Sequence, residues 1–315
     1  MKILGFDVGG TKISASIGEE NGTIVQRTEV PTTDTMDGNE MTRTLVDLGS
    51  EVMRLAGIDL PDSVGITFAG FIDFRKGMVI SSPNIPGIKN FPVSSIVSDF
   101  FQSKVYLEND ANAAAIAEHV FGSGIGKRDF VYVTLSTGIG AGIFANGKLL
   151  TGKNGLGGEV GHMKVTDKPF ICGCGRTGCF EAAAGGAGIV RRTIGRMASS
   201  KAQSTLRKMP LAELSAKNIL NAAYAGDKLA EEILQETIHY LGIGLANLAI
   251  LFDPETIILG GGIMQNRDQF LVEVKASFER EMDGMFRKLD IVKSMPDVAD
   301  LAAISLPAFY GHRKN

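Results

Sequence analysis

All three cysteines of the chain fall within eight residues, Cys172-Gly-Cys174-Gly-Arg-Thr-Gly-Cys179, and His162 precedes them by ten residues. Three thiolates and one imidazole are the ligand set of a closed tetrahedral zinc site. Glycines between the cysteines favour a chelating turn, and the alternative interpretation is three reduced thiols in an intracellular protein. We therefore predict a structural Zn²⁺ held by His162, Cys172, Cys174 and Cys179.

Two carboxylic acids, Glu159 and Glu181, flank this predicted metal loop. A metal ion that orders the loop would also fix both carboxylates and one face of the His162 ring, whose second nitrogen then serves as a donor. Glycines close to Glu159 on both sides leave its backbone free to direct the side chain. The alternative for Glu159 is a solvated surface acid. The pattern predicts a polar ligand site supported by a structural metal.

Glycine turns follow three of the expected strands. The first, Asp7 to Lys12, combines backbone N–H groups that can approach an anion with a hydroxyl, an ammonium and a carboxylate able to hold Mg²⁺ through water. It is not a Walker loop, because a strand rather than a helix follows the glycines. Taken alone, this turn could equally be an ordinary hairpin.

The second turn, Ser136 to Gly142, repeats this chemistry with hydroxyls in place of the lysine, and the third is Gly260-Gly261-Gly262. For the third, a tight connection between strand and helix is the simpler alternative. Two similar hairpins could grip a polyphosphate from opposite sides, while the third turn could approach a nucleotide base or sugar. The predicted nucleotide-binding residues are Asp7, Gly9, Gly10, Thr11, Lys12, Thr137, Gly138, Gly260, Gly261 and Gly262.

The segment from Glu108 to Ala113 contains the acid–base candidate, Asp110. We expect Asp110 at the end of a strand and the start of a helix, where functional side chains often lie. There it could act as a general base that orients a hydroxyl and accepts its proton, a role that contributes ~10²–10⁴ in rate. Asn109 could bind a second hydroxyl. Alternatively, Asn109 or Asp110 only caps the helix that we expect to begin near Asn112.

Short apolar runs and longer helical patterns alternate along the chain, which predicts an α/β fold. Strands are expected at 2–8, 11–17, 23–30, 63–68, 105–108, 130–135, 141–144 and 256–259, and helices at 41–55, 112–121, 189–197, 215–225, 228–252, 268–281 and 297–309. The order strand, glycine turn, strand, turn occurs twice, which indicates an internal duplication of fold. Two domains are therefore predicted, residues 1–110 with about 298–315, and residues 111–297.

Composition restricts the class of protein. The chain has 315 residues, 44% of them apolar and 21% charged, enough for two sizeable cores. A net charge of −3 without a basic block argues against a nucleic-acid partner. No stretch approaches the ~20 apolar residues of a membrane span, and the N-terminus lacks a signal-peptide pattern. With the unpaired cysteines, this predicts a cytoplasmic protein without a membrane partner.

Together these motifs resemble the ROK family (repressor, open reading frame, kinase) of sugar kinases. The resemblance runs nearly end to end, and its most specific part is Glu159-x-x-His162 followed by Cys-x-Cys-Gly-x-x-Gly-Cys-x-Glu. It implies the two-domain actin-like ATPase (ribonuclease H-like) fold, with a mixed β-sheet flanked by helices in each domain and a ligand cleft between them. It also implies a homodimer or homotetramer.

The resemblance further implies roles for individual residues. ATP with Mg²⁺ would meet the glycine turns, where Lys12 matches a family lysine near the phosphates, and Asp110 matches the catalytic base. A hexose would lie deeper in the site. Its implied contacts are Asn84, Asn109, Asp110, Glu159, His162 and Glu181, and Gly70 is expected beside them.

The implied function is ATP-dependent phosphorylation of the 6-hydroxyl of an aldohexose. The loop Ser82–Gly87 resembles that of family glucokinases, whereas Ile88 stands where many members carry Trp, which leaves an N-acetylglucosamine or N-acetylmannosamine kinase as the alternative. The family also contains sugar-responsive repressors with a DNA-binding region before the first strand, but here Ile3 already begins that strand. A non-catalytic sugar sensor is a third possibility, against which the retained Asp110 argues.

Overall fold

The computed structural model describes residues 1–265, 267–285 and 289–311. The chain divides into two compact units. The first unit comprises Met1–Arg128, Gly142–Gly158 and Ser294–Asn315, and the second comprises Asp129–Ala141 and Glu159–Lys293. The predicted domain limits at residues 110 and 298 stay a prediction, as does the ligand cleft, and residues 312–315 of the predicted first domain lie outside the described part.

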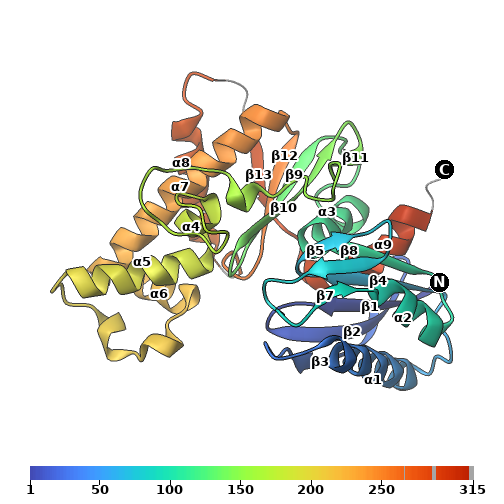
Figure 1. The fold of residues 1–315 in the computed structure, drawn as a ribbon. Helices are drawn as coiled ribbons and strands as arrows, with labels where there is room; N and C mark the ends of the chain where they lie inside the picture. The colour runs from blue at the N-terminus through green and yellow to red at the C-terminus, as the bar shows by residue number, and fades with distance from the viewer. Residues whose placement is uncertain (266, 286–288, 312–315) are drawn as a thin grey trace. The chain divides into compact units, whose positions relative to one another are not determined.

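The first unit is built on a five-stranded mixed sheet with the order β3-β2-β1-β4-β8 (Figure 1). Its central strand β1 pairs antiparallel with β2 and parallel with β4, and β4 pairs parallel with β8. The strands are β1 (Lys2–Val8), β2 (Lys12–Glu19), β3 (Ile24–Pro31), β4 (Ser63–Phe68) and β8 (Val105–Asn109).

A second five-stranded sheet has the order β11-β10-β9-β12-β13, in which β12 pairs parallel with both β9 and β13. The strands are β9 (Phe130–Leu135), β10 (Ile139–Ala145), β11 (Lys148–Leu149), β12 (Thr256–Gly260) and β13 (Asp290–Lys293). Both sheets place their first strand centrally, the next two strands to one side and the last two to the other. The predicted duplication of fold is confirmed by this shared order.

A small three-stranded antiparallel sheet interrupts the first unit after β4. Its strands are β5 (Phe71–Asp73), β6 (Met78–Ser81) and β7 (Lys89–Phe91), in the order β5-β6-β7. The loop Ser82–Gly87, which the sequence singled out, connects β6 to β7. This sheet was not predicted.

Helices cover both faces of the first sheet, and they are α1 (Gly38–Ala56), α2 (Val93–Phe101), α3 (Asp110–Phe121) and α9 (Val298–Gly311). On one face, the apolar side of α1 and α2 packs into a core with strand residues such as Phe6 and Ile66. On the other face, α9 lies so close that a Cβ on Gly65 would fall 1.9 Å from the carbonyl oxygen of Ala303. A side chain at Gly65 would therefore displace α9.

The other helices of the described residues belong to the second unit. They are η1 (Val160–His162), α4 (Phe180–Ala184), α5 (Gly186–Ser199), η2 (Thr205–Lys208), η3 (Leu211–Glu213), α6 (Ala216–Tyr224), α7 (Lys228–Phe252) and α8 (Asp268–Glu281). The limits of α7 and α8 are those predicted. Asp227 caps α7, where its Oδ1 accepts from the backbone N–H of Ala230 at 3.2 Å. Within the described residues, none of the helices combines the length and apolar character needed to cross a lipid bilayer.

Three predicted helix starts are too late: α1 begins at Gly38 rather than at residue 41, α5 begins at Gly186 rather than at residue 189, and the third is that of α3. α3 begins at Asp110, two residues before the expected Asn112, because Asn109 is its N-cap. The Asn109 Oδ1 accepts from the backbone N–H groups of Ala111 at 3.0 Å and Asn112 at 3.3 Å. A capping side chain at that position satisfies the first turn and so starts the helix directly after β8.

A row of polar side chains crosses the α9-covered face of the first sheet. The register pairs Asp7 of β1 with Ser14 of β2 and Thr67 of β4, and Thr67 with Glu108 of β8. Thr67 and Glu108 are fully buried, at 0% and 1% exposure. The Thr67 hydroxyl donates to Asp7 Oδ1 at 2.7 Å. Burial raises the pKa of Asp7 from its usual 3.8, only partly opposed by that hydrogen bond.

Replacement of Asp7 by Asn is expected to raise the melting temperature at pH 7.5 by a few degrees. The folded state binds the Asp7 proton more tightly than the unfolded state does, so the ionised carboxylate lowers the free energy of unfolding at neutral pH. The difference between the proteins should shrink as the pH falls and Asp7 becomes protonated. Differential scanning calorimetry from pH 7.5 to 4.5 measures both effects.

Asp300→Asn is the control for this prediction, because it removes an acid of α9 that forms an ion pair with Arg27. That variant should be unchanged or slightly less stable at pH 7.5. A clear loss of stability in Asp7→Asn at pH 7.5 would show that its carboxylate stabilises the free protein.

Candidate active site and metal centre

The first predicted phosphate turn joins β1 to β2 as a hairpin. The backbone N–H of Gly9 donates to the Lys12 carbonyl at 3.0 Å, and the Thr32 hydroxyl donates to the Gly9 carbonyl at 2.8 Å. A Cβ on Gly10 would lie 2.6 Å from Cβ of Asn84. The glycine turn therefore lies directly against the loop that carries the predicted sugar contact Asn84.

Cations and acids alternate beside this turn. Lys12 Nζ lies 3.0 Å from Glu29 Oε2, and Arg27 lies 2.6 Å from the same carboxylate oxygen. Arg27 also contacts Asp300 of α9 at 2.7 Å. Thr11 is exposed at the tip of the turn. The sequence identified Lys12 but gave no sign of Arg27 and Glu29, which lie beside it only because β3 pairs with β2.

The predicted base lies at the β8–α3 junction, as expected. Asp110 is the first residue of α3 and is exposed. The preceding Asn109 both caps the helix and, through Nδ2, donates to the carbonyl of Gly70 at 3.2 Å. Ser82 holds the adjoining loop in place, since its hydroxyl donates to the Ala69 carbonyl at 2.7 Å. The first unit thus gathers predicted sugar contacts from three separate segments.

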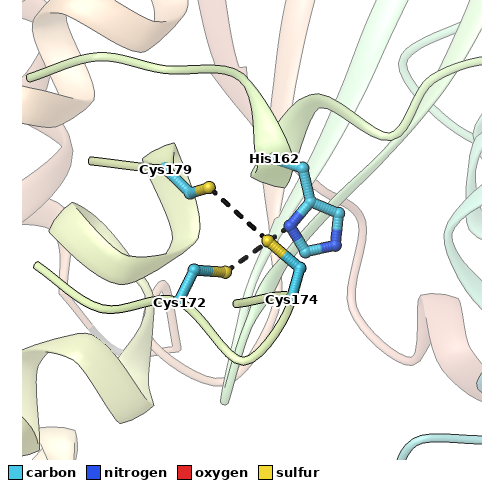
Figure 2. Close-up of side chains that lie close together, drawn as sticks. All are labelled: His162, Cys172, Cys174 and Cys179. Atoms are coloured by element: carbon cyan, nitrogen blue, oxygen red, sulfur yellow. Dashed lines mark hydrogen bonds between the residues drawn. The ribbon is translucent and has the colours of Figure 1, made fainter. Parts of the chain in front are cut away.

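The four predicted metal ligands converge in the second unit, as Figure 2 shows. Their ligand atoms all lie within 4.8 Å of one another. Cys172 Sγ is 3.6 Å from His162 Nδ1, and Cys174 Sγ is 3.8 Å from Cys179 Sγ. A tetrahedron with Zn–S bonds of about 2.3 Å has S–S edges of about 3.8 Å. Donor types and spacing both fit a tetrahedral metal ion.

Backbone and side-chain contacts order the ligand loop. A hydrogen bond from the Arg176 backbone lowers the pKa of the Cys174 thiol to about 6, whereas burial raises the pKa of Cys172 to about 12. Arg176 also donates through its guanidinium to the carbonyl of His162 at 2.8 Å. A dication would let all three sulfurs ionise, because it offsets their mutual repulsion and their burial.

Glu181 connects the metal cluster to the second glycine turn. Its Oε1 lies 3.7 Å from Cys172 Sγ, and its Oε2 accepts from the backbone N–H of Ile139 at 3.3 Å. A Cβ on Gly138 would lie 2.2 Å from that same Oε2, so a larger residue at this position would displace the carboxylate from its place. The sequence placed Glu181 beside the cysteines but could not reveal its contact with residues 138–139.

Glu159 and His162 lie at the two ends of the short helix η1. The His162 backbone N–H donates to the Glu159 carbonyl at 3.1 Å. Burial raises the pKa of the Glu159 carboxyl, with opposing electrostatic contributions from His162 and Glu181. The structure therefore brings the three predicted sugar contacts of the second unit into one neighbourhood, with His162 Nδ1 turned toward the sulfurs (Figure 2).

The second and third glycine turns lie side by side at the carboxyl ends of two parallel strands. Gly260 of β12 pairs with Thr134 of β9, and the backbone N–H of Ile263 donates to the Leu135 carbonyl at 3.0 Å. Gly261 has φ +89°, and a Cβ there would lie 2.3 Å from Leu135 O. This proximity brings together residues 137–138 and 260–262, which the sequence assigned to one nucleotide site.

The first turn of α5 packs onto the second glycine turn. Gly186 N–H donates to the Ser136 carbonyl at 2.9 Å, and Ala187 N–H donates to the Thr137 carbonyl at 2.8 Å. These bonds satisfy amides that a helix start otherwise leaves without partners. They also fix which way the peptide groups of the turn face.

The comparisons with known proteins agree with these motifs. A sequence profile of the ROK family matches residues 3–301. A glucokinase of Halalkalibacterium halodurans is 36% identical over 282 residues, which cover 88% of this chain and 84% of that protein. An N-acetylmannosamine kinase of Escherichia coli O157:H7 is 32% identical over 263 residues, or 84% of each.

Among solved structures, a ROK family glucokinase from Streptomyces griseus in complex with glucose and AMPPNP superposes with a TM-score of 0.84. It is 31% identical, and the alignment covers 98% of this chain and 99% of that chain. The predicted fold class is thereby confirmed. The chain belongs to the ROK family, and its fold is that of the family's actin-like sugar kinases.

Proposed function

We propose that the protein is an ATP-dependent hexose kinase that phosphorylates the 6-hydroxyl of an aldohexose, with glucose as the first candidate. The main support is similarity over most of the chain to proteins named glucokinase, which are 36% and 34% identical in two cases. The geometry supports the same activity, because Asp110 directly follows Asn109, which caps α3 and donates to the carbonyl of Gly70.

Asp110 is proposed as the general base. It lies in the first turn of α3, where the dipole of the helix stabilises a negatively charged side chain. The carboxylate accepts the proton of the 6-hydroxyl as that oxygen forms its bond to the γ-phosphorus, and the bond from phosphorus to the ADP oxygen breaks. Phosphoryl transfer demands mainly positioning and charge neutralisation, and Mg²⁺ bound with ATP supplies part of the latter.

Besides Asp110, the proposed hexose contacts are Gly70, Asn84, Asn109, Glu159, His162 and Glu181. A hexose offers many hydroxyls and no charge, so carboxylates and amides at fixed positions discriminate against analogues that lack a hydroxyl. The contacts of Asn109 with Gly70 and of Glu181 with Ile139 support this proposal, because each holds a side chain in a defined orientation.

The nucleotide is proposed to bind the three glycine turns. Backbone N–H groups of residues 9–12 and 137–138 would face the phosphates with Lys12 nearby, Asp7 would hold the Mg²⁺ through water, and residues 260–262 would approach the base or sugar. We further propose that the protein is cytoplasmic, because its clustered cysteines suit a reducing compartment, and that it is a homodimer or homotetramer, as the family resemblance implies.

An N-acetylmannosamine kinase is the second candidate activity. It is supported by the 32% identity to the Escherichia coli O157:H7 enzyme over 84% of this chain. The two candidates differ at the 2-substituent of the sugar, so substrate preference separates them.

Turnover on a panel of sugars tests the proposed function. Purified protein with Mg²⁺ and ATP is expected to release ADP in a coupled assay with glucose, and the product should be the 6-phosphate by NMR. The other sugars are mannose, fructose, N-acetylglucosamine and N-acetylmannosamine. Greater kcat/KM with N-acetylmannosamine would select the second candidate, and no turnover on any sugar would refute the kinase proposal.

Zinc is proposed as the metal of the four-ligand cluster, where it would fix the loop that carries His162 and precedes Glu181. Elemental analysis of untreated protein is expected to find about one Zn²⁺ per chain. Chelation should lower the melting temperature and raise the KM for hexose more than the KM for ATP, because the ligands adjoin the proposed sugar contacts.

Cys174→Ser removes an exposed ligand and is expected to reproduce the effect of chelation. Absence of any transition metal from untreated protein would contradict the zinc proposal.

A further inference from the structure

Glu108 is a buried carboxyl group two residues before the proposed base. It lies in β8, one residue before the strand ends, and it is 1% exposed. An acidic side chain in such a position is costly unless several donors surround it. Neither the sequence motifs nor the proposed chemistry gives this residue a role.

Three hydrogen bonds converge on the Glu108 carboxyl group. Its Oε1 accepts from the backbone N–H of Asn109 at 2.9 Å and from Asn112 Nδ2 at 3.2 Å. Its Oε2 accepts from the hydroxyl of Tyr310 at 2.5 Å. Tyr310 lies near the end of α9, 202 residues from Glu108 in the sequence. One carboxyl group thus ties the β8–α3 junction to the last turn of α9.

The donors on the junction side lie on either side of Asp110. Glu108 accepts a hydrogen bond from the backbone N–H of Asn109. The Asn109 side chain in turn caps α3 by accepting from the Ala111 N–H, and it donates to the Gly70 carbonyl. Glu108 also accepts from the side chain of Asn112, in the first turn of α3. Asp110 lies between these two fixed points. Its backbone direction therefore depends on contacts that Glu108 makes on both sides.

The ring of Tyr310 is itself held in place. It stacks on Tyr106 of β8 with an interplanar angle of 8° and meets Phe309 edge to face. The hydroxyl is therefore presented to Glu108 by packing, and its removal changes the hydrogen bond without removing the ring.

We propose that Glu108, held by Tyr310, is a positioning residue that sets the orientation of Asp110 and Asn109 for the hexose hydroxyls. This inference rests on the proposed hexose kinase activity. Small displacements of a catalytic group cost much more rate than stability, so the pair is expected to act on the sugar reaction more than on folding. The hydrogen bonds of Glu108 go to Asn109, Asn112 and Tyr310, so we expect the KM for ATP to change less than the KM for the hexose.

Tyr310→Phe tests the proposal. It is expected to lower kcat/KM for the hexose about tenfold, divided between a lower kcat and a higher hexose KM, while the KM for ATP stays within about twofold. Glu108→Gln should have a similar effect, because glutamine keeps the shape but alters the bond to Tyr310. The double variant should lose no more than the worse single variant, since both act through one contact.

Tyr106→Phe is the matched control, because it removes a phenolic hydroxyl from the same stacked pair without touching the contact between Tyr310 and Glu108. Its kinetics should equal those of the unmodified protein. Wild-type rates in Tyr310→Phe would overturn the inference, as would an equal rise in both KM values or additive losses in the double variant. If the unmodified protein phosphorylates no sugar, the proposed function fails instead.

Discussion

Burial of acidic side chains at the carboxyl ends of β1 and β8 is the constraint that shapes the first unit. Asp7 and Glu108 lie in one register row with Thr67 between them, under the face that α9 covers. Each carboxyl group needs donors at fixed places, because burial raises the pKa of both. Those donors come from β4, from the β8–α3 junction and from α9. The same hydrogen bonds that offset burial therefore fix the residues proposed to bind ATP and hexose.

In the second unit, the four proposed metal ligands and the carboxylate of Glu181 fix the residues proposed to bind substrate. The loop containing Cys172 and Cys179 has few apolar contacts of its own, so a metal ion would supply the order that packing does not. Glu181 extends that order to the second glycine turn through Ile139. Two proposed functions, sugar recognition and phosphate binding, thus depend on one local structure within this unit.

The sequence predicted those parts of the structure in which local signals agree. The capped, continuous apolar pattern of α7 fixed both its limits, and the spacing of cysteines and His162 identified the ligand cluster. Short strands β5, β6, β7, β11 and β13 were missed because two to four residues carry too little periodicity. The contacts of Glu108 with Tyr310 and of Glu181 with Ile139 were also missed. They join segments far apart in the chain, and only the sheet register and the path of α9 bring them together.

The measurement that tests this account most directly compares hexose binding with turnover in Asp110→Asn. Asparagine keeps the size and most hydrogen bonds of the side chain but cannot accept the hydroxyl proton. Isothermal titration calorimetry should find hexose affinity within a few fold of the unmodified protein, while kcat falls by about 10²–10⁴. A near-normal kcat in this variant would contradict the assignment of Asp110 as the base.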